Sequence, residues 1–119
     1  MAGILIVDDA KFMRVTLGNM VRSGGHVVVG EAENGLEAVE KFKDLQPDLV
    51  TMDVTMPEMD GIQAVKRIID DYPGAVIIMC SAMGQQRVVM DAIEAGAKDF
   101  IVKPFEESRV LEAIGRILS

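Results

Sequence analysis

The chain has 119 residues, half of them hydrophobic, so it is long enough to bury the core of one domain. Its formal net charge of −7 argues against direct binding to nucleic acid or to an anionic membrane surface. No apolar stretch approaches the roughly 20 residues of a membrane span, and the first residues lack the basic region of a signal peptide. The one cysteine, Cys80, forms no intrachain disulfide, which fits a reducing compartment. We therefore expect a cytoplasmic protein made of a single domain, residues 1–119.

Short apolar runs alternate with segments of helical periodicity five times along the chain. The runs, which we predict to be buried parallel strands, are Ile4–Val7, Val27–Val29, Leu49–Asp53, Ala75–Ser81 and Phe100–Val102. A helix is expected after each run; the first four end near Gly24–Gly25, Gln46–Pro47, Tyr72–Gly74 and Gly96, and the last contains Val110–Leu118. Such repeated strand–helix units favour an α/β fold, with a mainly parallel sheet and helices on both faces.

Ionisable residues stand where three of these strands end. Asp8 and Asp9 follow the first strand, Asp53 ends the third, and Lys103 follows the fifth. In an open α/β sheet the ligand site lies just past the carboxyl ends of the strands, so these groups are expected to converge. Three carboxylates beside one ammonium group repel each other unless a cation joins them. The pattern predicts a divalent metal site, and carboxylate oxygens suit magnesium.

Two further segments lie at the same end of the predicted sheet. The loop from Asp53 to Gly61 combines carboxylates with proline and glycine, and a backbone carbonyl of such a loop can join a site for a hard cation. Ser81 ends the fourth strand and brings a hydroxyl group to the same place.

Each of these residues also has an ordinary structural interpretation. Asp8 or Asp9 could cap the helix that follows them, Ser81 could be a cap or turn residue, and Lys103 could be a surface lysine. Nothing in the local sequence demands a carboxylate at Asp53. A reactive group at all four strand ends by accident is improbable, so we favour a functional site.

Three other residue types that could have a functional role, cysteine, histidine and methionine, are better explained by structure. Cys80 lies inside an apolar run and is interpreted as a small buried hydrophobe. His26 has no histidine or cysteine partner for a metal and is interpreted as a surface residue. Most of the nine methionines have core spacing, while Met59 and Met83 lie in loops near the expected site.

On these motifs the chain resembles the receiver domains of two-component response regulators, over all 119 residues. The resemblance is carried, in this order, by Asp8–Asp9, Asp53, Met56–Gly61, Ser81–Ala82 and Lys103–Pro104. It implies a single-domain, flavodoxin-like, doubly wound sheet of five parallel strands in the order 2-1-3-4-5 with five helices and no output domain. It also implies a cis bond between Lys103 and Pro104.

The resemblance further assigns a role to each site residue. Asp53 would accept a phosphoryl group. Magnesium would be bound by Asp9, Asp53 and the backbone carbonyl of Thr55, with Asp8 acting mainly through a metal-bound water. Lys103 and Ser81 would contact phosphoryl oxygens.

The resemblance also implies a conformational switch. Ser81 and Phe100 would form it: Phe100 would turn from an exposed to a buried position when phosphate draws Ser81 inward. Thr55 and Met83 occupy positions that tune the lifetime of the phosphate, and neither side chain readily positions an attacking water.

The stretches Asp9–Arg14 and Cys80–Gln86 resemble the single-domain chemotaxis regulators found outside the enteric bacteria. This implies a phosphorylation-activated signalling protein, not an enzyme, that assists its own magnesium-dependent phosphorylation and dephosphorylation. Its partners would be a histidine kinase of the CheA type, a flagellar switch protein of the FliM type and a phosphatase, and the protein itself would be a monomer. The alternative is a phosphorelay intermediate that passes phosphate to a histidine phosphotransfer protein.

Two other classes fit the sequence poorly. A hydrolase of the haloacid dehalogenase type needs Asp-Xaa-Asp-Xaa-Thr after its first strand, and Asp8–Lys11 does not provide it. A flavin-binding module is disfavoured because aromatic residues make up only 4% of the chain, tryptophan is absent, and no phosphate-binding loop follows the first strand.

Overall fold

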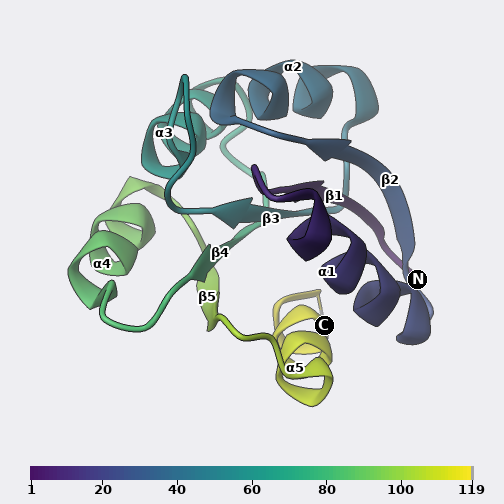
Figure 1. The fold of residues 1–119 in the computed structure, drawn as a ribbon. Coiled ribbons are helices and arrows are strands. Elements are labelled where there is room, and N and C mark those ends of the chain that lie inside the picture. Colours follow the sequence, from purple (N-terminus) through teal and green to yellow (C-terminus); the bar gives the residue numbers. More distant parts are fainter. Residues whose placement is uncertain (119) are drawn as a thin grey trace.

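The computed structural model describes residues 1–118, which form a parallel sheet between two layers of helices (Figure 1). The elements in chain order are β1 (Gly3–Val7), α1 (Lys11–Ser23), β2 (Val27–Ala32), α2 (Gly35–Leu45), β3 (Leu49–Asp53), α3 (Gly61–Asp71), β4 (Ile77–Ser81), α4 (Gln86–Ala95), β5 (Asp99–Val102) and α5 (Glu107–Leu118). The strand order is β2-β1-β3-β4-β5. The predicted fold class and strand order are therefore confirmed.

The two faces of the sheet carry separate hydrophobic clusters. Helices α2, α3 and α4 cover one face, and α1 and α5 lie side by side on the other (Figure 1). Side chains alternate between the faces along each strand, so Leu5 and Val7 pack with the first group of helices, and Ile4 and Ile6 with the second. Among residues 1–118, no helix is long and apolar enough to span a bilayer.

The helix starts answer the question of which residues are caps. Helix α1 starts after Ala10, which makes no side-chain cap, and α4 starts after Gln85. The alternative interpretation of Asp8, Asp9 and Ser81 as helix caps is therefore wrong. The Asp8 side chain instead accepts from the Ala10 N–H within the turn before α1 (2.9 Å).

Four strand boundaries differ from the prediction: β1 and β5 each start one residue earlier than expected, and β2 and β4 differ by more. Strand β2 continues beyond Val29 to Ala32, because its last residues still pair with β1 although Gly30 interrupts the apolar pattern. Strand β4 starts at Ile77, since the N–H of Ala75 bonds to the carbonyl of Tyr72 and completes the turn after α3.

The structure also tests two single-residue predictions. His26 is only partly buried, and its ring accepts a hydrogen bond at Nδ1 from the Ala2 N–H (3.1 Å), a contact that the sequence did not predict. Gly25, at φ 87°, forms the turn that precedes His26. The Lys103–Pro104 bond is cis, as predicted.

Candidate functional site

The sheet register aligns the acidic residues at one edge. Val7 of β1 lies opposite Met52 of β3, so the next residues along these strands, Asp8 and Asp53, are also level. Carboxylate oxygens of Asp8, Asp9 and Asp53 all lie within 4.8 Å of one another. Asp8 and Asp53 are buried, with exposed fractions of 4% and 7%, whereas Asp9 is exposed. The predicted convergence of these carboxylates is confirmed.

Lys103 reaches this cluster from the segment after β5. Its N–H bonds to the carbonyl of Ser81 (2.7 Å), which fixes the backbone beside the end of β4. Its Nζ lies 2.8 Å from Asp8 Oδ2 and 3.3 Å from Asp53 Oδ1. Lys103 is therefore ion-paired with the acidic cluster and is not an isolated surface lysine.

The electrostatics of the cluster show an excess of negative charge. Burial, and next the charge of Asp8, raise the pKa of Asp53 from 3.8 to about 6, although Lys103 opposes the rise. Burial alone would lower the pKa of Lys103, but its hydrogen bond to Asp8 and the charges of Asp53 and Asp8 raise it overall. One lysine thus leaves the ionised form of Asp53 less favourable than that of an ordinary aspartate in water. An oxygen-only donor set with surplus negative charge fits a hard divalent cation.

Arg14 of α1 contacts the backbone of the acidic cluster, a role that was not predicted from the sequence. Its guanidinium is buried and donates to the backbone carbonyl of Asp8 (Nη1, 2.7 Å) and to Glu31 Oε1 (Nε, 2.9 Å). The available signal was its position, because Arg14 shares the buried face of α1 with Leu17 and Val21. A charged residue on an apolar helix face needs a partner inside the protein.

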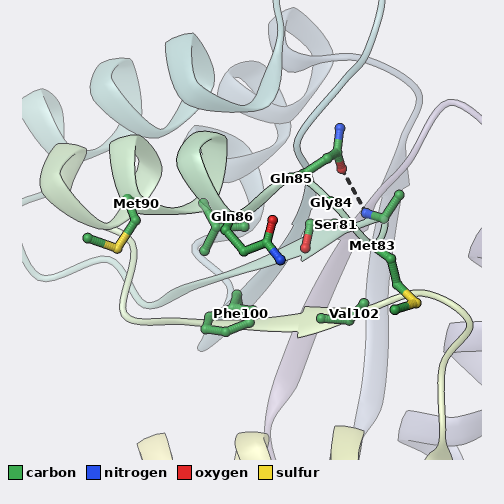
Figure 2. A pocket seen from close by; sticks show the side chains of 10 residues that line it. Ser81, Met83, Gly84, Gln85, Gln86, Met90, Phe100 and Val102 are labelled. Carbon is green, nitrogen blue, oxygen red and sulfur yellow. Dashed lines mark hydrogen bonds between the residues drawn. The ribbon is translucent and has the colours of Figure 1, made fainter.

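The opposite side of the site is formed by the loop between β4 and α4. Ser81 is buried at the end of β4, while Met83 is 82% exposed and Gly84 has φ 89°. Gln85 Oε1 accepts a hydrogen bond from the Ala82 N–H (2.7 Å), drawn as the dashed line in Figure 2. Its Nε2 donates to the hydroxyl of Thr55 (3.4 Å), a long contact that joins this loop to the one after β3. No sequence signal pointed to Gln85.

A hollow of about 430 Å³ lies beside Ser81 and is lined mainly by apolar groups. Figure 2 shows Gln86 and Met90 of α4 on one side of it and Phe100 and Val102 of β5 on the other. Phe100 is 45% exposed.

Cys80 lies next to Asp53 across the β3–β4 ladder and is fully enclosed. Burial raises the pKa of its thiol, and the charge of Asp53 adds to the rise. The interpretation of Cys80 as a buried hydrophobe is confirmed.

The fold and this cluster are those of a receiver domain. Residues 4–115 match the response regulator receiver domain family, and the chain belongs to that family.

Among characterised relatives, it is 61% identical to the chemotaxis protein CheY of Thermotoga maritima over 114 residues, or 96% of this chain and 95% of the relative. It is 64% identical to the CheY of Bacillus subtilis over 116 residues, or 98% and 97% of the two chains. A solved relative is found in the CheX-CheY-BeF3-Mg+2 complex from Borrelia burgdorferi, with a TM-score of 0.94 and 39% identity over 98% of this chain and 89% of that one.

Proposed function

We propose that this protein is a chemotaxis response regulator of the cytoplasm. It is activated when Asp53 accepts a phosphoryl group from a histidine kinase of the CheA type. One observation carries the proposal: Asp53 is a buried carboxylate within reach of two further carboxylates and one lysine, at the carboxyl ends of the strands. The relatives at 60–64% identity that are named chemotaxis protein CheY support the pathway.

The contacts support Asp53, among the three acids, as the proposed nucleophile. Asp8 is already engaged by Lys103 at 2.8 Å and by the Ala10 N–H at 2.9 Å. Asp9 is exposed, so water solvates it. Asp53 is buried and has only the longer contact with Lys103, which leaves an oxygen that is poorly solvated and available for attack.

In the proposed reaction a carboxylate oxygen of Asp53 attacks phosphorus, and an acyl phosphate forms. The P–N bond of the donor phosphohistidine breaks, and the imidazole leaves with the electron pair. Lys103 Nζ, between Asp8 and Asp53, is positioned to offset charge on a phosphoryl oxygen. Asp8, Asp9, Asp53 and the Thr55 carbonyl would hold magnesium, which when bound neutralises charge on the transferring group.

Loss of the phosphoryl group requires a water that attacks the acyl phosphate. Thr55 and Met83 are exposed beside the site, and neither carries an acid or amide that would orient such a water. We propose that a CheY phosphatase shortens the lifetime of the signal. The relative solved together with CheX, beryllofluoride and magnesium supports a partner that recognises the activated state.

The output surface in this proposal is the face formed by α4, β5 and α5. The phosphoryl group draws Ser81 inward, and Phe100 turns into the hollow beside it, so this face changes shape. A flagellar switch protein of the FliM type would bind the changed face more tightly and thereby alter flagellar rotation. The hollow next to Ser81 and the exposed position of Phe100 support this sequence of events.

The test starts with acetyl phosphate and magnesium. Mass spectrometry is expected to find one phosphoryl group on the wild type, none on Asp53→Asn, and an unchanged yield on Asp44→Asn, which alters an exposed carboxylate of α2. Phosphorylation that persists in Asp53→Asn would refute the assignment.

The partner is tested next with the beryllofluoride form. A FliM N-terminal peptide is expected to bind it more tightly than the free form. If the phosphoryl group instead passes rapidly to a histidine phosphotransfer protein and the peptide does not bind, the protein is a phosphorelay intermediate.

A further inference from the structure

The Gln85 side chain occupies a main-chain hydrogen-bond donor at the edge of the phosphoryl site. Its Oε1 accepts from the Ala82 N–H at 2.7 Å (Figure 2). Gln85 immediately precedes α4, yet its side chain does not cap that helix and folds back over the loop instead.

The strand geometry shows which way this donor points. The carbonyl of Cys80 accepts from the Val54 N–H of the segment after β3, and the carbonyl of Ser81 accepts from the Lys103 N–H on the β5 side. Peptide groups alternate in direction along a strand, so Ala82, two residues after Cys80, again faces the β3 side. Asp53 is the β3 residue paired with Cys80. The Ala82 N–H is thus directed toward the space next to Asp53.

The same carboxamide ties two loops together. Its Nε2 reaches the Thr55 hydroxyl, two residues after Asp53, at 3.4 Å. Gln85 therefore links the loop that begins at Ser81 to the loop that begins at Asp53. Because Ala82 directly follows Ser81, a shift of the Ser81 backbone would also displace the N–H that Gln85 holds.

We propose that Gln85 is a positioning residue that acts as an internal substitute for the phosphoryl group: it occupies the Ala82 N–H in the resting protein and is displaced when Asp53 carries a phosphoryl group. Displacement frees the donor for a phosphoryl oxygen and releases the tie to Thr55. The resting state is stabilised by these two contacts, so they oppose activation. The inference rests on the proposed function, because it needs an anion on Asp53.

The experiment measures the affinity for beryllofluoride in saturating magnesium, by amide shifts, in the wild type and in Gln85→Ala. The variant is expected to bind about threefold to tenfold more tightly, the range that one lost intramolecular hydrogen bond predicts. Before beryllofluoride is added, the Ala82 amide of the variant is expected to shift and to exchange faster with solvent. Affinity for magnesium alone is expected to be the same in both proteins.

Two further variants separate the contact of Gln85 with Ala82 from its contact with Thr55 and from unspecific effects of a substitution in this region. Asp91→Asn alters an exposed carboxylate of α4 that does not line the hollow, and this variant is expected to bind beryllofluoride like the wild type. Thr55→Val removes only the long contact, so a smaller gain than in Gln85→Ala is expected.

The possible failures are distinguishable. Equal or weaker beryllofluoride binding by Gln85→Ala, with the wild type binding normally, would overturn the role of Gln85 and leave the proposed function intact. An absence of beryllofluoride binding at Asp53 in the wild type would overturn both.

Discussion

The two sides of the candidate site are built differently. We call residues 8–10, between β1 and α1, together with Asp53 at the end of β3, the acidic side, and residues 82–85, between β4 and α4, the loop side. The acidic side is fixed by strong contacts from three directions: Arg14 from α1, Lys103 from beyond β5, and the Ala10 N–H within the turn itself. On the loop side, the side-chain hydrogen bonds seen among residues 1–118 all involve Gln85.

This difference matches the two tasks of the proposed switch. Metal binding and phosphoryl transfer need carboxylates in fixed positions, because small displacements cost much of the rate. Signalling needs a segment with two arrangements of similar free energy, which few weak contacts allow. The proposed function thus places the chemistry on the acidic side and the movement on the loop side. The predictions below test that division.

The largest expected effect concerns the charge of Asp53 in the metal-free protein. Its pKa of about 6 lies above the ordinary value of 3.8, so the ionised group destabilises the fold above pH 6. A shift of this size corresponds to at most about 3 kcal/mol. Metal-free Asp53→Asn is expected to be more stable than the wild type by up to that amount well above pH 6, and the difference should shrink as the pH falls toward 3.8.

Urea unfolding in a chelator, across a series of pH values, measures this difference. Added magnesium is expected to stabilise the wild type more than the variant, since only the wild type keeps all three carboxylates. A stability difference that is independent of pH would contradict the charge argument.

Loss of the support beneath the acidic side is expected to have the next largest effect. Arg14→Met keeps the length of the side chain but leaves the buried carbonyl of Asp8 without its donor. We expect a loss of about 1–3 kcal/mol in the free energy of unfolding and about 10–100-fold weaker magnesium binding. Calorimetric titration with magnesium measures the second effect.

Arg22→Met is the matched control, since Arg22 is exposed on the same helix. It is expected to leave magnesium affinity unchanged. If both variants lose affinity equally, the loss reflects total charge and not the contact with Asp8.

A smaller effect is expected on the loop side from Ser81→Ala. The variant should still be phosphorylated, because Asp53 and Lys103 are intact, but it lacks the hydroxyl that couples phosphate to the loop. The ratio of partner affinities with and without beryllofluoride is expected to fall by up to about tenfold, the equivalent of about 1.4 kcal/mol. Ser23→Ala, at the exposed end of α1, is the control. Full coupling in Ser81→Ala would show that this hydroxyl is dispensable.

The acidic side was also the more predictable from the sequence. The strands could be located because apolar runs rich in valine and isoleucine have few alternatives to burial, and Asp8, Asp9 and Asp53 follow such runs directly. The rule that strand ends meet at one edge then brought the carboxylates together. The same reasoning predicted that Lys103 lies at this edge. Its ion pairs with Asp8 and Asp53 additionally require the long side chain to reach from the end of β5 to the ends of β1 and β3.

What remained hidden were contacts between side chains and the main chain. Arg14 bonds to the carbonyl of Asp8, Gln85 to the Ala82 N–H, and His26 to the Ala2 N–H. Every residue offers the same backbone groups, so the sequence carries no mark of which one a side chain will reach. Only the folded path of the chain places the partners together.

The smallest effect is expected at Gly84, where the loop side depends on backbone freedom. Gly84 has φ 89°, and a Cβ added there would meet no atom within 4 Å. Any cost of Gly84→Ala therefore comes from the backbone conformation, about 1 kcal/mol, since residues with a side chain disfavour this region. Gly74→Ala is the matched control: it has equal space and no positive φ, so it should be neutral or slightly stabilising. Thermal unfolding of both variants measures the difference.

The position of Gly84 on the loop side also predicts its effect on binding. Gly84→Ala should leave magnesium affinity unchanged while altering the affinity for beryllofluoride. A change in magnesium affinity would show that the two sides of the site are not independent.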